Sequence, residues 1–142
     1  MALVRRFSDN FRKGFWTALY EYVLVTLPVG IYVMLESLHK KEWIVLLTTP
    51  EWSIATIFLS FISINRYRSS LERSGRKIFE PLFGLISVLA LILIVGATLN
   101  AYVSMEQESG GAIFLRIAFF LVASLKFIIL VTGSKLLHTS KD

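Results

Sequence analysis

Four apolar stretches, separated by short polar segments, dominate the pattern of the chain. They cover residues of about 15–35, 50–65, 81–103 and 113–133. A stretch of about 20 apolar residues is long enough to cross the hydrocarbon core of a bilayer as a helix. The pattern predicts an all-α integral membrane four-helix bundle, with residues 1–142 forming a single transmembrane domain. The turn at 106–111 is so short that the third and fourth stretches form an antiparallel hairpin.

The basic residues between the stretches predict the orientation. Lys and Arg concentrate in the N-terminal arm, in the connection 66–80 and in the C-terminal tail, whereas the opposite side carries Lys40 and Lys41. Because cytoplasmic segments are rich in Lys and Arg, both termini and the connection 66–80 are predicted to be cytoplasmic. We expect a multi-pass protein of the bacterial inner (cytoplasmic) membrane. Arg116, near the outer boundary, is expected to snorkel outwards.

Composition agrees with a membrane protein and argues against an enzyme. Charged residues make up 18% of the chain, and the mean hydropathy is +0.65. The absence of cysteine excludes disulfides and thiolate metal sites. The histidines His39 and His138 lie on opposite sides of the membrane in the predicted topology. We therefore expect no enzymatic activity, catalytic residue, cofactor or metal site.

Lys126 lies near the centre of the fourth stretch. A charge at this depth is expensive and requires a partner, water or a function. Glu21 in the first stretch is the predicted partner, through a lysine side chain that reaches towards the cytoplasm. An ion pair that fixes helix packing and a proton relay or gate are both consistent with this intramembrane charge pair.

Hydroxyl side chains form a stripe on the second stretch. They recur at i, i+3, i+7 and i+10, a spacing that places them on one face of a helix, and they are Ser53, Thr56, Ser60 and Ser63. Such a face is a candidate pore lining in a homo-oligomer. It is equally typical of a face where membrane helices pack together. Both interpretations stay open at the level of sequence.

The cytoplasmic connection supplies a basic surface, formed by Arg66, Arg68, Arg73, Arg76 and Lys77. A cytosolic protein partner and anionic lipid head groups are the two candidate ligands. Direct binding of nucleic acid is not expected, because basic residues on the cytoplasmic side are explained by membrane topology.

The chain has four predicted spans, and its serine-rich second span runs from Ser60 into a basic connection at Arg68. In these features and in its size, it resembles small membrane proteins of bacterial antiphage systems. KwaA-like proteins of the Kiwa system imply a homo-oligomeric membrane subunit that holds a cytosolic effector. RexB-like exclusion proteins imply an ion channel. We therefore expect a homo-oligomer that contacts membrane lipids and recruits a cytosolic partner for antiviral defence. The alternative is a RexB-like or holin-like pore lined by the hydroxyl stripe.

Overall fold

The computed structural model describes residues 2–74, 80–106 and 109–139. Within these ranges the chain is all-α and contains no strand, which confirms the all-α part of the prediction. Its helices are α1 (Ala2–Lys40), α2 (Val45–Thr48), α3 (Glu51–Ser74), α4 (Glu80–Glu106) and α5 (Gly110–Thr139).

Three of the long helices contain segments apolar and long enough to cross a membrane. These segments are Ser8–Lys40, Pro81–Ser104 and Gly110–Ser134. The chain is therefore a helical membrane protein. Helix α3 does not reach the same hydropathy, because its apolar residues share the helix with the hydroxyl stripe and several arginines. It has 24 residues and a length of about 36 Å, enough for a core of about 30 Å. A crossing by α3 stays a prediction.

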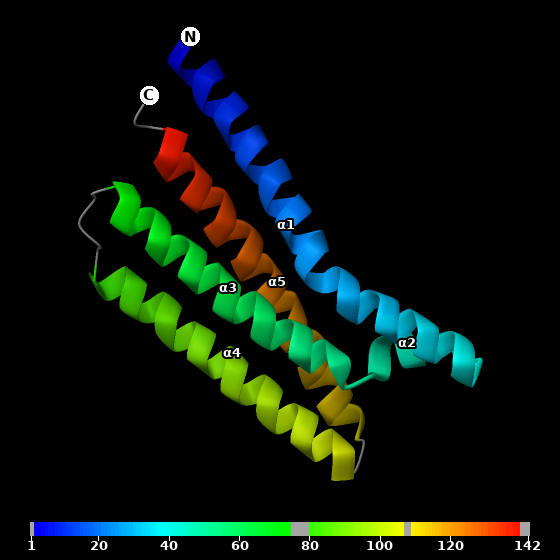
Figure 1. The fold of residues 1–142 in the computed structure, drawn as a ribbon. Coiled ribbons are helices and arrows are strands. Elements are labelled where there is room, and N and C mark those ends of the chain that lie inside the picture. Colours follow the sequence, from blue (N-terminus) through cyan, green and yellow to red (C-terminus); the bar gives the residue numbers. More distant parts are fainter. Residues whose placement is uncertain (1, 75–79, 107–108, 140–142) are drawn as a thin grey trace.

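The arrangement of the helices places α3 inside the bundle. It lies between α4 and α5, and α1 packs against α5 and α3 (Figure 1). The start of α1, the end of α3, the start of α4 and the end of α5 lie at one end, while α2, the end of α4 and the start of α5 lie at the other (Figure 1). The order of the helices agrees with an up-down bundle. The assignment of the first end to the cytoplasm rests on its basic residues.

The core draws on all four long helices. Its buried cluster consists of Ala18, Leu59, Leu93, Ala123, Phe127 and Val131. Small residues such as Ala18 and Ala123 allow membrane helices to approach closely. Large apolar side chains, in contrast, cover the outside of the bundle, as at Leu85, Phe114 and Leu125. Large apolar side chains on the outside are expected of a surface that faces lipid, since soluble monomers rarely expose extended apolar patches.

Helix α1 has 39 residues, which corresponds to about 58 Å, far more than a bilayer core requires. Its N-terminal part continues the same helix beyond the apolar segment. Pro28 lies within the helix, where it removes a backbone hydrogen bond. Figure 1 shows that α1 bends near its middle. Because of the bend, the two halves of α1 run in different directions relative to the other helices (Figure 1).

The turn after α1 positions the start of α3. Lys41 adopts a φ of 56°, a left-handed conformation that ends the helix. The hydroxyl of Ser37 donates to the carbonyl of Glu42 at 3.0 Å, and the indole Nε1 of Trp52 donates to the carbonyl of Leu46 at 2.6 Å. These two bonds tie the segment containing α2 to both neighbouring helices.

Candidate functional site: the polar interface of α3 and α5

The hydroxyl stripe of α3 is fully enclosed by the bundle. Its four residues are at most 1% exposed, and they are Ser53, Thr56, Ser60 and Ser63. The helix that packs most extensively against α3 is α5. Within one protomer, the face that is a candidate pore lining is therefore a packed interface.

Only part of the stripe is satisfied by hydrogen bonds. The Thr56 hydroxyl donates to the Trp52 carbonyl at 2.9 Å, and the Ser63 hydroxyl donates to the Ser60 carbonyl at 3.1 Å. The hydroxyls of Ser53 and Ser60 are buried without a partner among the described residues. A buried hydroxyl without a partner costs about 1–3 kcal/mol. The α3–α5 interface is therefore polar and imperfectly satisfied.

Lys126 of α5 reaches into this interface. Its residue exposure is 7%, and its ammonium Nζ donates to the backbone carbonyl of Ser60 at 3.3 Å. The lysine thus contacts the middle of the hydroxyl stripe. The negative end of the Ser60 carbonyl dipole stabilises its positive charge.

Glu21 forms its ion pair with a different residue. Its Oε2 lies 3.6 Å from Nη2 of Arg66, with the arginine side chain 55% exposed. The predicted pair between Glu21 and Lys126 is therefore not the contact that the structure forms. The reason is depth: Lys126 contacts α3 at residue 60 and Glu21 contacts it at residue 66, which are about 9 Å apart along the helix axis. The lysine ammonium instead donates to the Ser60 carbonyl, which lies at its own depth.

The basic connection begins as an extension of α3 beyond the hydroxyl stripe. Arg66 pairs with Glu21, and Nε of Arg68 donates to Oε1 of Glu72 at 2.9 Å, with both side chains more than half exposed. Arg73 is exposed near the end of α3. The remaining two predicted residues, Arg76 and Lys77, lie outside the described residues. An exposed pair of the Arg68 type contributes only about 0.3–0.5 kcal/mol.

Arg116 of α5 is a buried charge whose role was not predicted. It is 1% exposed and is among the largest fully buried side chains. Its Nε donates to Oδ1 of Asn100 at 3.3 Å, and its Nη2 donates to the Ser104 hydroxyl. The expectation that Arg116 snorkels outwards is wrong, because the side chain is buried and donates to two polar side chains of α4 inside the bundle.

A signal for this second polar cluster is present in the sequence. Asn100 and Ser104 are four residues apart and therefore share one face of α4. The short turn between α4 and α5 brings that face opposite the first turns of α5, where Arg116 lies. Asn100 also donates from Nδ2 to the carbonyl of Ala112 at 2.8 Å. Polar contacts thus fix the hairpin at the end where α4 finishes and α5 begins.

Among the described residues, no group of three or more His, Cys, Asp or Glu side chains is placed to hold a metal ion. No family model, curated protein or solved structure matches the chain. The function is therefore inferred from the geometry and charge of this membrane bundle.

Proposed function

We propose that the protein is a homo-oligomeric inner-membrane scaffold that anchors a cytosolic partner through the basic end of its bundle. The observation that carries this proposal is the burial of the hydroxyl stripe inside the bundle, on the helix that packs most extensively against α5. A pore between protomers needs a polar face turned towards the partner copy, and this face is used inside the protomer. The surface that remains is apolar along the membrane and rich in arginine at one end.

The basic end supports recruitment because Arg12 and Arg68 are exposed and form only weak pairs within their own helices. Arg12 lies 4.0 Å from Asp9, and Arg68 pairs with Glu72 on the same helix. Exposed pairs on one helix contribute little to stability. The acidic residues of a partner protein can therefore replace them at small cost, and such charges increase the association rate. The resemblance to antiphage membrane subunits suggests a defence effector as this partner.

The test removes the charge at this end and compares it with an equal change at the other end. Arg68→Gln with Arg73→Gln leaves the Glu21–Arg66 pair in place, and Lys40→Gln with Lys41→Gln is the matched control. Native-membrane purification with intact-mass measurement reports the oligomer and any bound protein. We expect the partner to be lost from the arginine variant alone, with steep salt dependence. Full retention of the partner in a correctly oriented arginine variant would refute the proposal.

A second candidate function is an ion channel through the α3–α5 interface of each protomer. Lys126 and the hydroxyls of Ser53 and Ser60 support it, since unsatisfied polar groups within a bundle can attract water. This path differs from the pore between protomers that the stripe predicts from sequence. It requires the packed interface to open.

Cysteine labelling separates the two functions, because the chain has no cysteine of its own. Single cysteines replace Ser53, Thr56, Ser60 and Ser63, with the lipid-facing Phe58 as negative control and the exposed Arg68 as positive control. A scaffold predicts that a membrane-impermeant thiol reagent, applied to opened membranes so that it reaches both faces, modifies the positive control only. Modification along the stripe, together with a changed ion flux in liposomes after modification at position 60, would favour the channel.

A further inference from the structure

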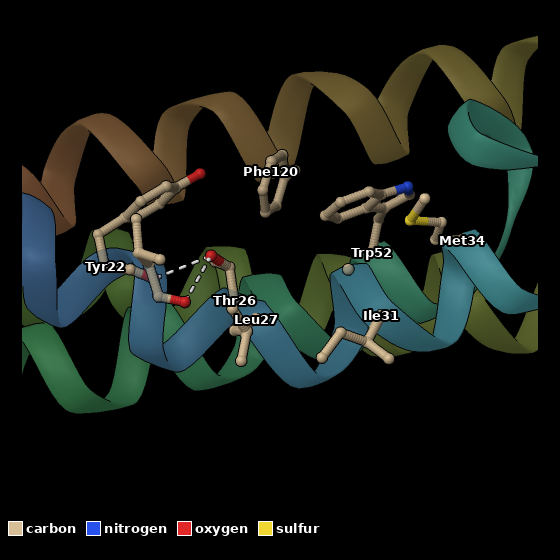
Figure 2. A pocket seen from close by; sticks show the side chains of 9 residues that line it. Tyr22, Thr26, Leu27, Ile31, Met34, Trp52 and Phe120 are labelled. Carbon is tan, nitrogen blue, oxygen red and sulfur yellow. Dashed lines mark hydrogen bonds between the residues drawn. The ribbon is translucent and has the colours of Figure 1, made fainter.

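A groove of about 360 Å³ lies between α1 and the pair formed by α3 and α5. Figure 2 shows Tyr22, Thr26 and Met34 of α1 on one side, with Trp52 of α3 and Phe120 of α5 facing them. The rings of Trp52 and Phe120 are 4.8 Å apart. We propose that this groove binds one acyl chain of a membrane phospholipid, independently of the scaffold function.

The polar atoms that line the groove already have partners in the protein. The Tyr22 hydroxyl is 3.1 Å from the Ser124 hydroxyl, and the Thr26 hydroxyl donates to the Tyr22 carbonyl at 2.9 Å. The indole of Trp52 donates to the Leu46 carbonyl. No polar side chain of the groove therefore requires water or a polar ligand. A dry apolar site of this kind favours a hydrocarbon occupant.

The groove opens where the bilayer supplies such an occupant. Leu27, Ile31 and Met34 line it and are exposed on the outside of α1. All three belong to the membrane-span segment Ser8–Lys40. The medium at this opening is the hydrocarbon core, so the nearest molecules are acyl chains. An acyl chain in the groove makes dispersion contacts with apolar side chains that otherwise line an unpacked gap.

The size of the groove favours an acyl chain over a helix of a second copy. Its volume is within the range of small-molecule sites, roughly 300–1,000 Å³. A membrane-crossing helix about 30 Å long and 10 Å wide occupies on the order of 2,000 Å³. A flexible chain without side groups fits a volume of this size, and a helix from another protomer fits it only through single side chains.

Gly30 provides a direct test of occupancy, because it lines the groove and a Cβ added there meets no atom within 4 Å. Substitution by Ala, Val and Leu therefore fills the groove in steps. Gly84 of α4 is equally open and lies outside the groove, which makes the same series at Gly84 the matched control. The graded series keeps the test valid if the largest side chain disturbs folding.

The probe is the fluorescence of Trp52 in vesicles of phosphatidylcholine with brominated acyl chains. Trp16→Phe and Trp43→Phe, both at exposed positions, leave Trp52 as the single tryptophan. Bromine on an acyl chain in the groove contacts this indole and quenches it. We expect Gly30→Leu to reduce quenching at least twofold, with Val and Ala intermediate, while the Gly84 series leaves quenching unchanged.

Two outcomes would overturn the proposal. Equal quenching in the Gly30 and Gly84 series would show that lipid does not enter the groove. Quenching that rises when the protein is diluted into excess brominated lipid would show that a second copy, and not lipid, occupies the groove at high protein density. Quenching independent of dilution and reduced by filling at Gly30 supports the acyl chain.

Discussion

Replacement of Lys126 by Met is the most direct test of the polar interface. The substitution removes a positive charge from the bundle and keeps an unbranched side chain that adapts to its surroundings. A lysine at the centre of a membrane helix costs about 2.5–3.5 kcal/mol on insertion scales. The structure offsets this cost with the hydrogen bond from Nζ to the Ser60 carbonyl at 3.3 Å.

The hydrogen bond is long, which limits its contribution. A bond to a charged group contributes about 1.5–3 kcal/mol, and 3.3 Å is beyond the usual N–H···O range. We therefore take the lower half of the interval of about 1.5–3 kcal/mol as the contribution of this hydrogen bond. The Ser60 carbonyl also loses little, because the Ser63 hydroxyl continues to donate to it at 3.1 Å. We expect Lys126→Met to stabilise the bundle by about 1 kcal/mol.

Reversible unfolding in mixed micelles, driven by a denaturing detergent and followed by far-UV circular dichroism, measures this change. A double-mutant cycle with Glu21→Gln tests the predicted Glu21–Lys126 pair at the same time. Because Glu21 and Lys126 contact α3 at different depths, their effects should add within about 0.5 kcal/mol. The reasoning fails if Lys126→Met destabilises the bundle by more than about 1 kcal/mol. It also fails if the coupling free energy between the two substitutions exceeds about 1 kcal/mol.

Two further substitutions and one control substitution test the α4–α5 hairpin with the same unfolding assay. Arg116→Ala should destabilise by about 3 kcal/mol, since it removes hydrogen bonds and leaves a void at a buried site; an effect below about 1 kcal/mol would contradict the buried role. Gly96→Ala should cost about 1–2 kcal/mol, because its Cβ would lie 2.9 Å from ring atoms of Phe119. Gly84→Ala, with open space, should be neutral or stabilising. Equal effects at the two glycines would argue against the close contact.

The long apolar helices are the part of this structure that sequence predicts well. Period and length identify Pro81–Ser104 and Gly110–Ser134 directly, because hydropathy is a property of the segment itself. The spacing of the hydroxyls likewise places them on one face of α3. These predictions need no knowledge of neighbouring helices.

The contacts between helices are less predictable, because hydropathy gives approximate depth and leaves rotation and exact register undetermined. Charge complementarity suggests Glu21 for Lys126, yet the lysine binds a backbone carbonyl, an acceptor that every residue carries. Arg116 looks like a boundary residue until the hairpin places Asn100 and Ser104 beside it. In both cases a local acceptor outweighs the partner suggested by charge or depth.

The same limit affects α3, whose hydropathy falls short although it lies inside the bundle. Its hydroxyl stripe, which includes Ser53 and Ser60, is buried inside the bundle. Its outer side carries Ile54, Phe58 and Phe61, which are large, apolar and exposed. In a helix that crosses, lipid would contact only this outer side. Hydropathy averaged over all faces therefore underestimates the ability of an enclosed helix to cross, since polar side chains turned inwards are tolerated.

The crossing by α3 has a simple topological consequence. If α1, α3 and α4 all cross, Ser8 and Ser109 lie on opposite sides of the membrane. If α3 stays at the surface, α4 returns the chain and the two residues lie on the same side. Both serines are exposed, so single cysteines there can be labelled from outside intact cells with an impermeant reagent. We expect labelling at position 109 and protection at position 8 until the cells are opened. Equal labelling from one side would show that the bundle crosses three times and that α3 is an interfacial helix.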